Sequence, residues 1–110
     1  MFWADLAPRS GSEQSGRRPV IVISHDGFNQ TANWRSIIVV PVSTSDAQSR
    51  RRLTVIPLRE GTASLPNSSV AVCHQVTTLD RAKLKNRMGF LPPDILNAVE
   101  QGLRAALDLD

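Results

Sequence analysis

Two arginines directly after a glycine-bounded polar loop are the first residues in the sequence that are equipped for chemistry. The loop reads Gly-Ser-Glu-Gln-Ser-Gly over residues 11–16, and Arg17, Arg18 and Pro19 lead from it into the apolar run 20–23. Pro19 suits the first position of a strand because it lacks an N–H donor. At the mouth of a sheet, the Arg18 guanidinium can bind a phosphate through two parallel hydrogen bonds. The alternative is a surface hairpin loop with a solvated arginine pair.

Several segments around this loop resemble the MazF/PemK-type toxin family. Residues 4–8 (ADLAP), 11–14 (GSEQ) and 16–24 (GRRPVIVIS) resemble its opening signature. Residues 39–44 (VVPVST) resemble its third core strand, and residues 70–80 resemble its late strand before a short helix. The match runs in register over nearly the whole chain, and the Gly-x-Arg-Pro ending of the loop is its most specific part.

Length and composition limit the classes of protein that fit. The 110 residues predict one domain, residues 1–110, which buries roughly 65% of its extended-chain surface. The single cysteine, Cys73, has apolar neighbours and is expected to be an inert core thiol. No cluster of metal-ligating residues is evident, so no metal and no other cofactor is expected. Without a signal peptide or a membrane span, the predicted localisation is cytoplasmic.

Charge is distributed unevenly along the chain. The net charge is +3 and the pI about 10.0, with basic residues gathered at 17–18, 50–52 and 81–87. Residues 93–110 instead hold four acidic residues and one basic residue, Arg104. This pattern predicts one side that faces a polyanion and one acidic end.

Five segments are expected to be strands. The run 20–24 is largely β-branched, which is typical of a central strand buried on both faces. Pro41 predicts an edge position or a bulge in the strand that contains it. Residues 28–35 are expected to form a loop. The expected strands are residues 2–6, 20–24, 36–44, 53–58 and 70–76.

Two helices are expected near the end of the chain. The Asp80 carboxylate can accept a hydrogen bond from the amide of Ala82 or Lys83, and so cap a short helix that runs through Lys85 and ends at Gly89. A longer helix begins at residues 92–94, Pro-Pro-Asp, and its apolar face should pack on the sheet. That face consists of Ile95, Leu96, Val99, Leu103, Ala106 and Leu107.

Short strands and a closing helix predict a small, mostly β (α+β) fold, either a partly closed barrel or a curled antiparallel sheet. The resemblance implies the SH3-like barrel with a C-terminal helix found in the MazF and CcdB toxins. It also implies a symmetric homodimer that uses the first-to-second strand loop and the late strands.

The resemblance implies the toxin of a type II toxin-antitoxin system, a sequence-specific endoribonuclease that cleaves single-stranded RNA (mRNA) without a metal. The ribose 2′-hydroxyl attacks the phosphate, leaving a 2′,3′-cyclic phosphate and a 5′-hydroxyl. Arg18 is the first candidate to stabilise the charge that develops, because a guanidinium gives up its proton reluctantly. Thr44 aligns with the family's catalytic threonine, and Ser43 takes its place if the register slips by one residue. Glu13 is either the base or a group that orients Arg18.

RNA contacts and partners follow from the same resemblance. The candidate RNA-binding residues are Ser12, Gln14, Arg17, Ser43, Arg50, Arg51, Arg52 and Gln75. A solvated loop is the alternative interpretation for the three arginines. Trp3 fits the core better than a base-stacking role, and Trp34 fits either. The protein partner is a cognate antitoxin whose acidic tail covers the basic cleft.

Two other functions fit the same fold. One is a CcdB-like toxin that poisons DNA gyrase, which needs neither the arginine of the Gly-x-Arg-Pro sequence nor the threonine at the strand end. The other is a non-catalytic SH3-like binding module, which the 5% aromatic content and the lack of tyrosine disfavour.

Overall fold

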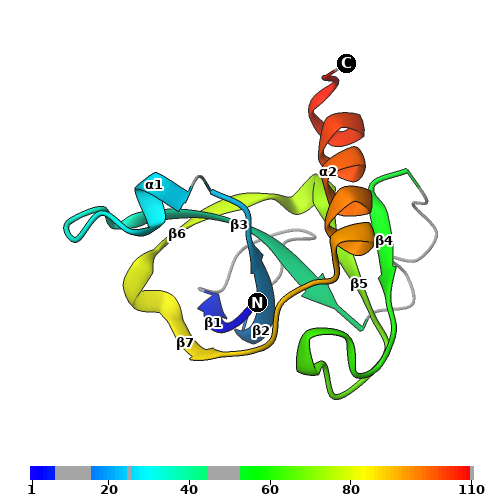
Figure 1. The fold of residues 1–110 in the computed structure, drawn as a ribbon, viewed down its shortest axis with the longest axis horizontal. Helices are drawn as coiled ribbons and strands as arrows, with labels where there is room; N and C mark the ends of the chain where they lie inside the picture. The colour runs from blue at the N-terminus through cyan, green and yellow to red at the C-terminus, as the bar shows by residue number, and fades with distance from the viewer. Residues whose placement is uncertain (7–15, 25, 45–52, 110) are drawn as a thin grey trace.

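The computed structural model describes residues 1–6, 16–24, 26–44 and 53–109. Its strands form one antiparallel sheet that curls without closing, and the C-terminal helix α2 (Pro93–Leu107) packs at one end of it (Figure 1). The predicted curled sheet with a C-terminal helix is therefore confirmed. The strands are β1 (Phe2–Leu6), β2 (Gly16–Val22), β3 (Ser36–Ser43), β4 (Val55–Leu58), β5 (Ser69–Val72), β6 (Thr77–Asp80) and β7 (Leu84–Arg87).

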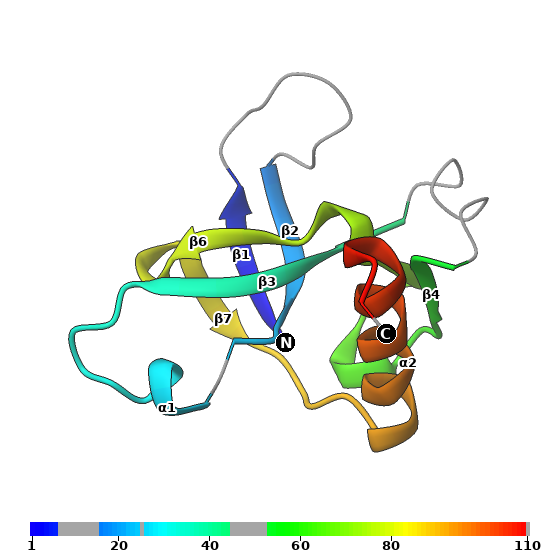
Figure 2. The same ribbon diagram turned by 90° about the horizontal axis from the view of Figure 1, so that it is seen from above.

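The strands follow the order β4-β5-β3-β2-β1-β7, and β6 also pairs with β3. Viewed from above, β3 and β6 run side by side, and α2 lies near β4 (Figure 2). One edge of β3 pairs with β6 as far as Val39 and with β5 from Val42 onward. Pro41 lies in the break between these two partners, where a strand tolerates a missing donor. Of the two alternatives predicted for Pro41, an edge position or a bulge, the edge position is wrong, because β3 is an interior strand.

β2 is interior, as predicted, but its limits differ from the prediction. It begins at Gly16, so Pro19 lies within the strand instead of at its first position. Pro19 pairs with Trp3 of β1, while the ladder to β3 begins one residue later at Val20. Pro19 is therefore tolerated because β2 is paired on only one side at this point.

The predicted strand 70–76 ends early: β5 stops at Val72, the 3₁₀ turn η3 (Cys73–Gln75) follows, and β6 begins only at Thr77. This turn carries the chain from one partner position on β3 to the next. The predicted helix through Lys85 is also wrong in extent. Asp80 does cap a turn, accepting from the Ala82 amide at 2.8 Å, but only the 3₁₀ turn η4 (Arg81–Lys83) forms. Pairing with β1 makes the following residues strand β7.

Two further boundaries depend on local context. The predicted strand 53–58 begins only at Val55. The first two residues of the predicted loop 28–35 belong to a single helical turn, α1 (Asp26–Asn29). Another 3₁₀ turn, η2 (Thr62–Ser64), interrupts the connection between β4 and β5. These turns shorten the expected strands and loops without changing the sheet.

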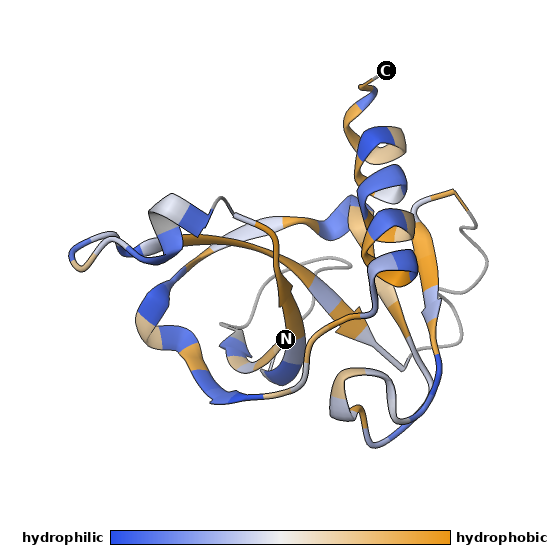
Figure 3. Ribbon diagram, in the orientation of Figure 1, coloured by the Kyte–Doolittle hydropathy of each residue, from blue (hydrophilic) through white to orange (hydrophobic). Residues whose placement is uncertain are grey.

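Hydrophobic residues predominate in β3, β4 and the second half of β2, whereas the η4–β7 segment is mostly hydrophilic (Figure 3). Helix α2 starts at the expected prolines and packs on η3 and β4 with Val99 fully buried. Leu96 and Leu107, expected on the packed face, are 39% and 53% exposed. Cys73 is buried as predicted, and burial raises the pKa of its thiol to about 11. In the part of the chain that the structure describes, no helix has the length and apolar character needed to span a membrane.

Candidate active site

A hollow of about 190 Å³ opens where the ends of β2 and β3 meet the connection between η2 and β5. It combines two guanidinium groups, two hydroxyl groups and an amide with apolar walls. Its lining residues are Trp3, Arg17, Arg18, Pro19, Val42, Thr44, Leu65, Pro66, Asn67 and Ser69.

Strand register explains why Arg18 and Thr44 share this hollow. Val20 of β2 pairs with Pro41 of β3, and the strands are antiparallel. The ladder between β2 and β3 stops at this pair, so residues 16–19 of β2 and residues 42–44 around the end of β3 lie at the same end of the ladder. Both side chains belong to exposed residues that line the hollow. Neighbouring strand ends therefore present a guanidinium and a hydroxyl group to the same space.

Arg17 and Trp3 form one wall of the hollow. The Arg17 guanidinium carbon lies 5.6 Å from the centroid of the Trp3 ring, within the range of a cation–π interaction. Trp3 is half-buried, so it serves the core only in part and also lines the hollow. This contact gives Arg17 a structural role beside any contact with a ligand.

The structure distinguishes the two hydroxyl candidates. Ser43 is 5% exposed, pairs with Val70 of β5 and does not line the hollow. Thr44 is the next residue, and side chains alternate between the two faces of a strand. The geometry therefore favours Thr44 as the hydroxyl donor in this hollow.

Asn67 was not among the residues singled out from the sequence. It reaches the hollow because η2 turns the chain back, with the Gly61 amide donating to the Leu65 carbonyl oxygen at 2.9 Å. The Ser69 hydroxyl donates to the Asn67 carbonyl oxygen at 2.9 Å and holds the loop in shape. The Pro66-Asn67 sequence marks a loop, but no local signal shows that this loop meets β2.

Several predicted site residues are not placed in the hollow. Ser12, Glu13, Gln14, Arg50, Arg51 and Arg52 lie outside the described residues. Their loops connect to described residues beside the hollow, at Gly16 and Thr44. Gly16 has a φ of 78°, a left-handed conformation that favours glycine at the start of β2. Gln75 lies in η3, partly buried, and does not line the hollow.

A second hollow of about 270 Å³ lies between the end of β2 and helix α2. Its walls are mainly apolar, and Asp26 and Glu100 are the charged residues that line it. Two carboxylates oppose the binding of a polyanion, so the first hollow is the better candidate for phosphate chemistry. Within the described ranges, no three His, Cys, Asp or Glu side chains are arranged to hold a metal ion.

The fold and the first hollow define a class of small curled-sheet proteins that present guanidinium and hydroxyl donors at adjoining strand ends. Residues 1–107 match the model of the PemK-like, MazF-like toxins of type II toxin-antitoxin systems. The chain belongs to this family.

Relatives and solved structures agree with this assignment. Endoribonuclease MazF2 of Mycobacterium bovis and Endoribonuclease MazF6 of Mycobacterium tuberculosis are each 36% identical, over 99% of this chain and 94% of theirs. MazF from Deinococcus radiodurans superposes with a TM-score of 0.77 at 26% identity, covering 98% of this chain and 92% of that one. A mycobacterial endoribonuclease in complex with its cognate antitoxin has the same fold, with a TM-score of 0.76 at 21% identity, over 99% and 91% of the two chains.

Proposed function

We propose that residues 1–110 form one toxin domain, a sequence-specific endoribonuclease that cleaves single-stranded RNA such as mRNA. The observation that carries the proposal is that Arg18 and Thr44 line one hollow at adjoining strand ends. Relatives named endoribonucleases, at 36% identity over nearly the whole chain, support the same activity.

The reaction is an internal displacement at phosphorus that needs no metal. The ribose 2′-oxygen forms a bond to the adjacent phosphorus, the bond from phosphorus to the 5′-oxygen breaks, and a 2′,3′-cyclic phosphate and a 5′-hydroxyl result. The attacking hydroxyl loses one proton and the leaving oxygen gains one. Negative charge grows on the non-bridging oxygens, which Arg18 and the Thr44 hydroxyl meet with hydrogen bonds.

Proton transfer is assigned to groups other than Arg18, since a guanidinium deprotonates reluctantly. Glu13 is the proposed base or, alternatively, the group that orients Arg18. Its loop enters β2 two residues before Arg18, at Gly16. Both roles for Glu13 predict a slower reaction when its carboxylate is removed. Only the base role predicts that the rise in rate with pH on the acidic side of the profile also disappears.

The proposed RNA contacts extend on both sides of the hollow. Arg17 and the arginines at 50–52 bind phosphates, and Ser12 and Gln14 read base edges. Gln75 and Ser43 are proposed to contact RNA outside the hollow, since neither lines it. The protein acts in the cytoplasm, where mRNA is present, as a homodimer that a cognate antitoxin neutralises by covering the basic hollow.

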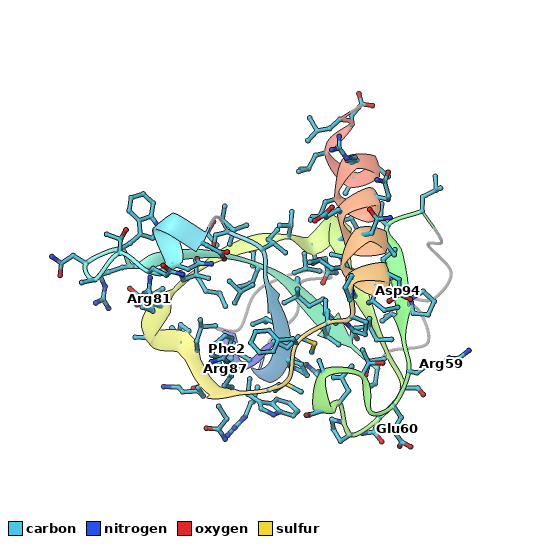
Figure 4. All side chains as sticks on the ribbon, viewed as in Figure 1. Phe2, Arg59, Glu60, Arg81, Arg87 and Asp94 are labelled. Carbon is cyan, nitrogen blue, oxygen red and sulfur yellow. The ribbon has the colours of Figure 1, made fainter. Side chains whose placement is uncertain are left out.

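Cleavage of a long defined RNA in EDTA, followed by mapping of the cut ends, tests the proposal. We expect cuts at one short sequence, with 5′-hydroxyl and cyclic phosphate ends, and Arg18→Ala should lose cleavage with the fold and the dimer intact. Arg59→Ala is the matched control, since Arg59 is exposed after β4, does not line the hollow and points away from the sheet (Figure 4). Cutting by Arg18→Ala at the parental rate removes the assignment. An absence of cutting together with inhibited gyrase supports the CcdB-like alternative.

A further inference from the structure

Phe90 is a large aromatic residue that the fold holds in solvent. It lies between β7 and α2 and is 77% exposed, whereas its neighbours Met88 and Leu91 pack against the core. The backbone here is fixed on both sides. The Gly89 amide donates to the Ala63 carbonyl oxygen at 3.0 Å, and the Gly89 carbonyl oxygen accepts from the Met1 amino group at 3.0 Å. The outward position of Phe90 is therefore built into the fold.

One cation lies against this aromatic ring, and others precede it along the chain. The guanidinium carbon of Arg87 lies 4.7 Å from the centroid of the Phe90 ring. Lys83 and Lys85 precede it along η4 and β7, and Arg81 and Arg87 mark the two ends of this basic segment (Figure 4). The segment is mostly hydrophilic, interrupted by the apolar residues Ala82 and Leu84 (Figure 3). Exposed aromatic rings beside cations are the elements from which single-stranded nucleic-acid sites are built.

Phe90 is also joined to two walls of the hollow. A Cβ on Gly89 would lie 3.0 Å from the Ala63 Cα, and Leu65, two residues after Ala63, lines the hollow. On the other side, Met1 bonds to Gly89, and Trp3, two residues after Met1, also lines it. Because two extended residues span at most about 7 Å, these paths from Phe90 to the residues that line the hollow are at most about 15 Å long, a distance that a few nucleotides bridge.

We propose that Phe90 is a base-stacking subsite for RNA that flanks the scissile phosphate, with Arg87 orienting the ring and meeting a phosphate. This inference rests on the proposed function. RNA is favoured over a protein partner because the charged group in contact with the Phe90 ring, Arg87, is a cation, and the buried centres of protein interfaces are depleted of charge. The subsite explains why a chain with 5% aromatic residues exposes this one.

The test compares RNA probes of two lengths in equilibrium binding. One is a 12-nucleotide RNA containing the mapped cleavage sequence, with a 2′-O-methyl group at the attacking ribose. The other is a 5-nucleotide RNA centred on the same cleavage site, with the same 2′-O-methyl group at the attacking ribose. Phe90→Ala should weaken binding of the long probe about five- to a hundredfold and leave the short probe unchanged. Phe90→Trp should restore binding, and Leu109→Ala, which removes another exposed apolar side chain, should change neither probe.

A third probe separates stacking from charge. When the flanking nucleotides of the 12-mer are abasic, Phe90→Ala should have no effect, because the phosphates remain and the bases are gone. Equal loss on the abasic probe overturns the stacking assignment. A second result would also overturn it. If Phe90→Ala changed self-association, measured by sedimentation, and left RNA affinity unchanged, Phe90 would be a contact between copies of this chain.

The proposed function and the subsite fail in different ways. A wild-type protein that cuts RNA, together with a Phe90→Ala variant that binds all three probes with parental affinity, overturns the subsite alone. A wild-type protein that neither cuts nor binds RNA overturns both.

Discussion

Replacing Gly102 with alanine should destabilise the fold, although a glycine-to-alanine change at an exposed helix position usually stabilises a protein. Gly102 lies where α2 packs most closely on η3. A Cβ there would lie 2.7 Å from the Cys73 Sγ and 3.3 Å from the Ile56 Cδ1. The Sγ atom has little room to move, because Cys73 is fully buried and its thiol donates to the Val99 carbonyl oxygen at 3.6 Å.

The magnitude follows from two opposing effects. Alanine in place of glycine within a helix lowers the free energy of the folded state by about 1 kcal/mol. Overpacking a filled core costs about 1–3 kcal/mol. The net loss in the free energy of unfolding is therefore expected to reach about 2 kcal/mol for Gly102→Ala.

Urea unfolding at fixed protein concentration measures this change, and the midpoint of Gly102→Ala should fall by roughly 1 M with an unchanged slope. Gln101→Gly, one residue earlier and exposed, is the control for helix propensity and should lose about 1 kcal/mol. In a Cys73→Ala background the Sγ is absent, so Gly102→Ala should become stabilising. A higher midpoint for Gly102→Ala in the parental protein would refute the packing argument.

Three further predictions concern the site and the core. Thr44→Val should lower kcat for RNA cleavage on the order of 10²-fold with KM little changed, measured on an oligonucleotide of the mapped sequence; an unchanged kcat would remove its hydroxyl from the mechanism. Changing residues 50–52 together to serine should weaken RNA binding. The slope of the logarithm of the binding constant against the logarithm of the salt concentration should become shallower by about 0.7 for each phosphate contact that is lost. An unchanged slope would identify a solvated loop. Because burial raises the pKa of the Cys73 thiol from 9.0 to about 11, the unfolded chain loses this proton first, so the free energy of unfolding should fall as pH rises from about 9 toward 11. Urea titrations at pH 8 and 10 should show a smaller fall for Cys73→Ala, and equal falls would contradict the burial effect.

Much of the site could be predicted from the sequence because it depends on neighbouring strands. The β-branched run around residue 21 and the run around residue 39 are strong strand signals, and their pairing needs only an antiparallel neighbour. That pairing places the strand ends that carry Arg18 and Thr44 next to each other, and both residues line the hollow there. Catalytic roles for these residues stay predictions until cleavage is measured.

Asn67, Phe90 and the limits of the late strands could not be predicted in this way. The loop at Asn67 meets β2 only because η2 turns the chain back, and Phe90 lies near the hollow only through Gly89 and Ala63. These contacts join residues far apart in sequence, and no local pattern encodes them.

The sequence alone determined the family, the central strands, the start of α2 and the burial of Cys73, because each depends on a local pattern or a matched motif. The tertiary structure decided that residues 70–76 divide into β5 and η3 before β6, and that residues 84–87 form a strand instead of a helix. The physical reason is that β3 changes its partner along one edge and β1 recruits β7. Backbone hydrogen bonds to distant strands outweigh the weaker local preferences of these segments.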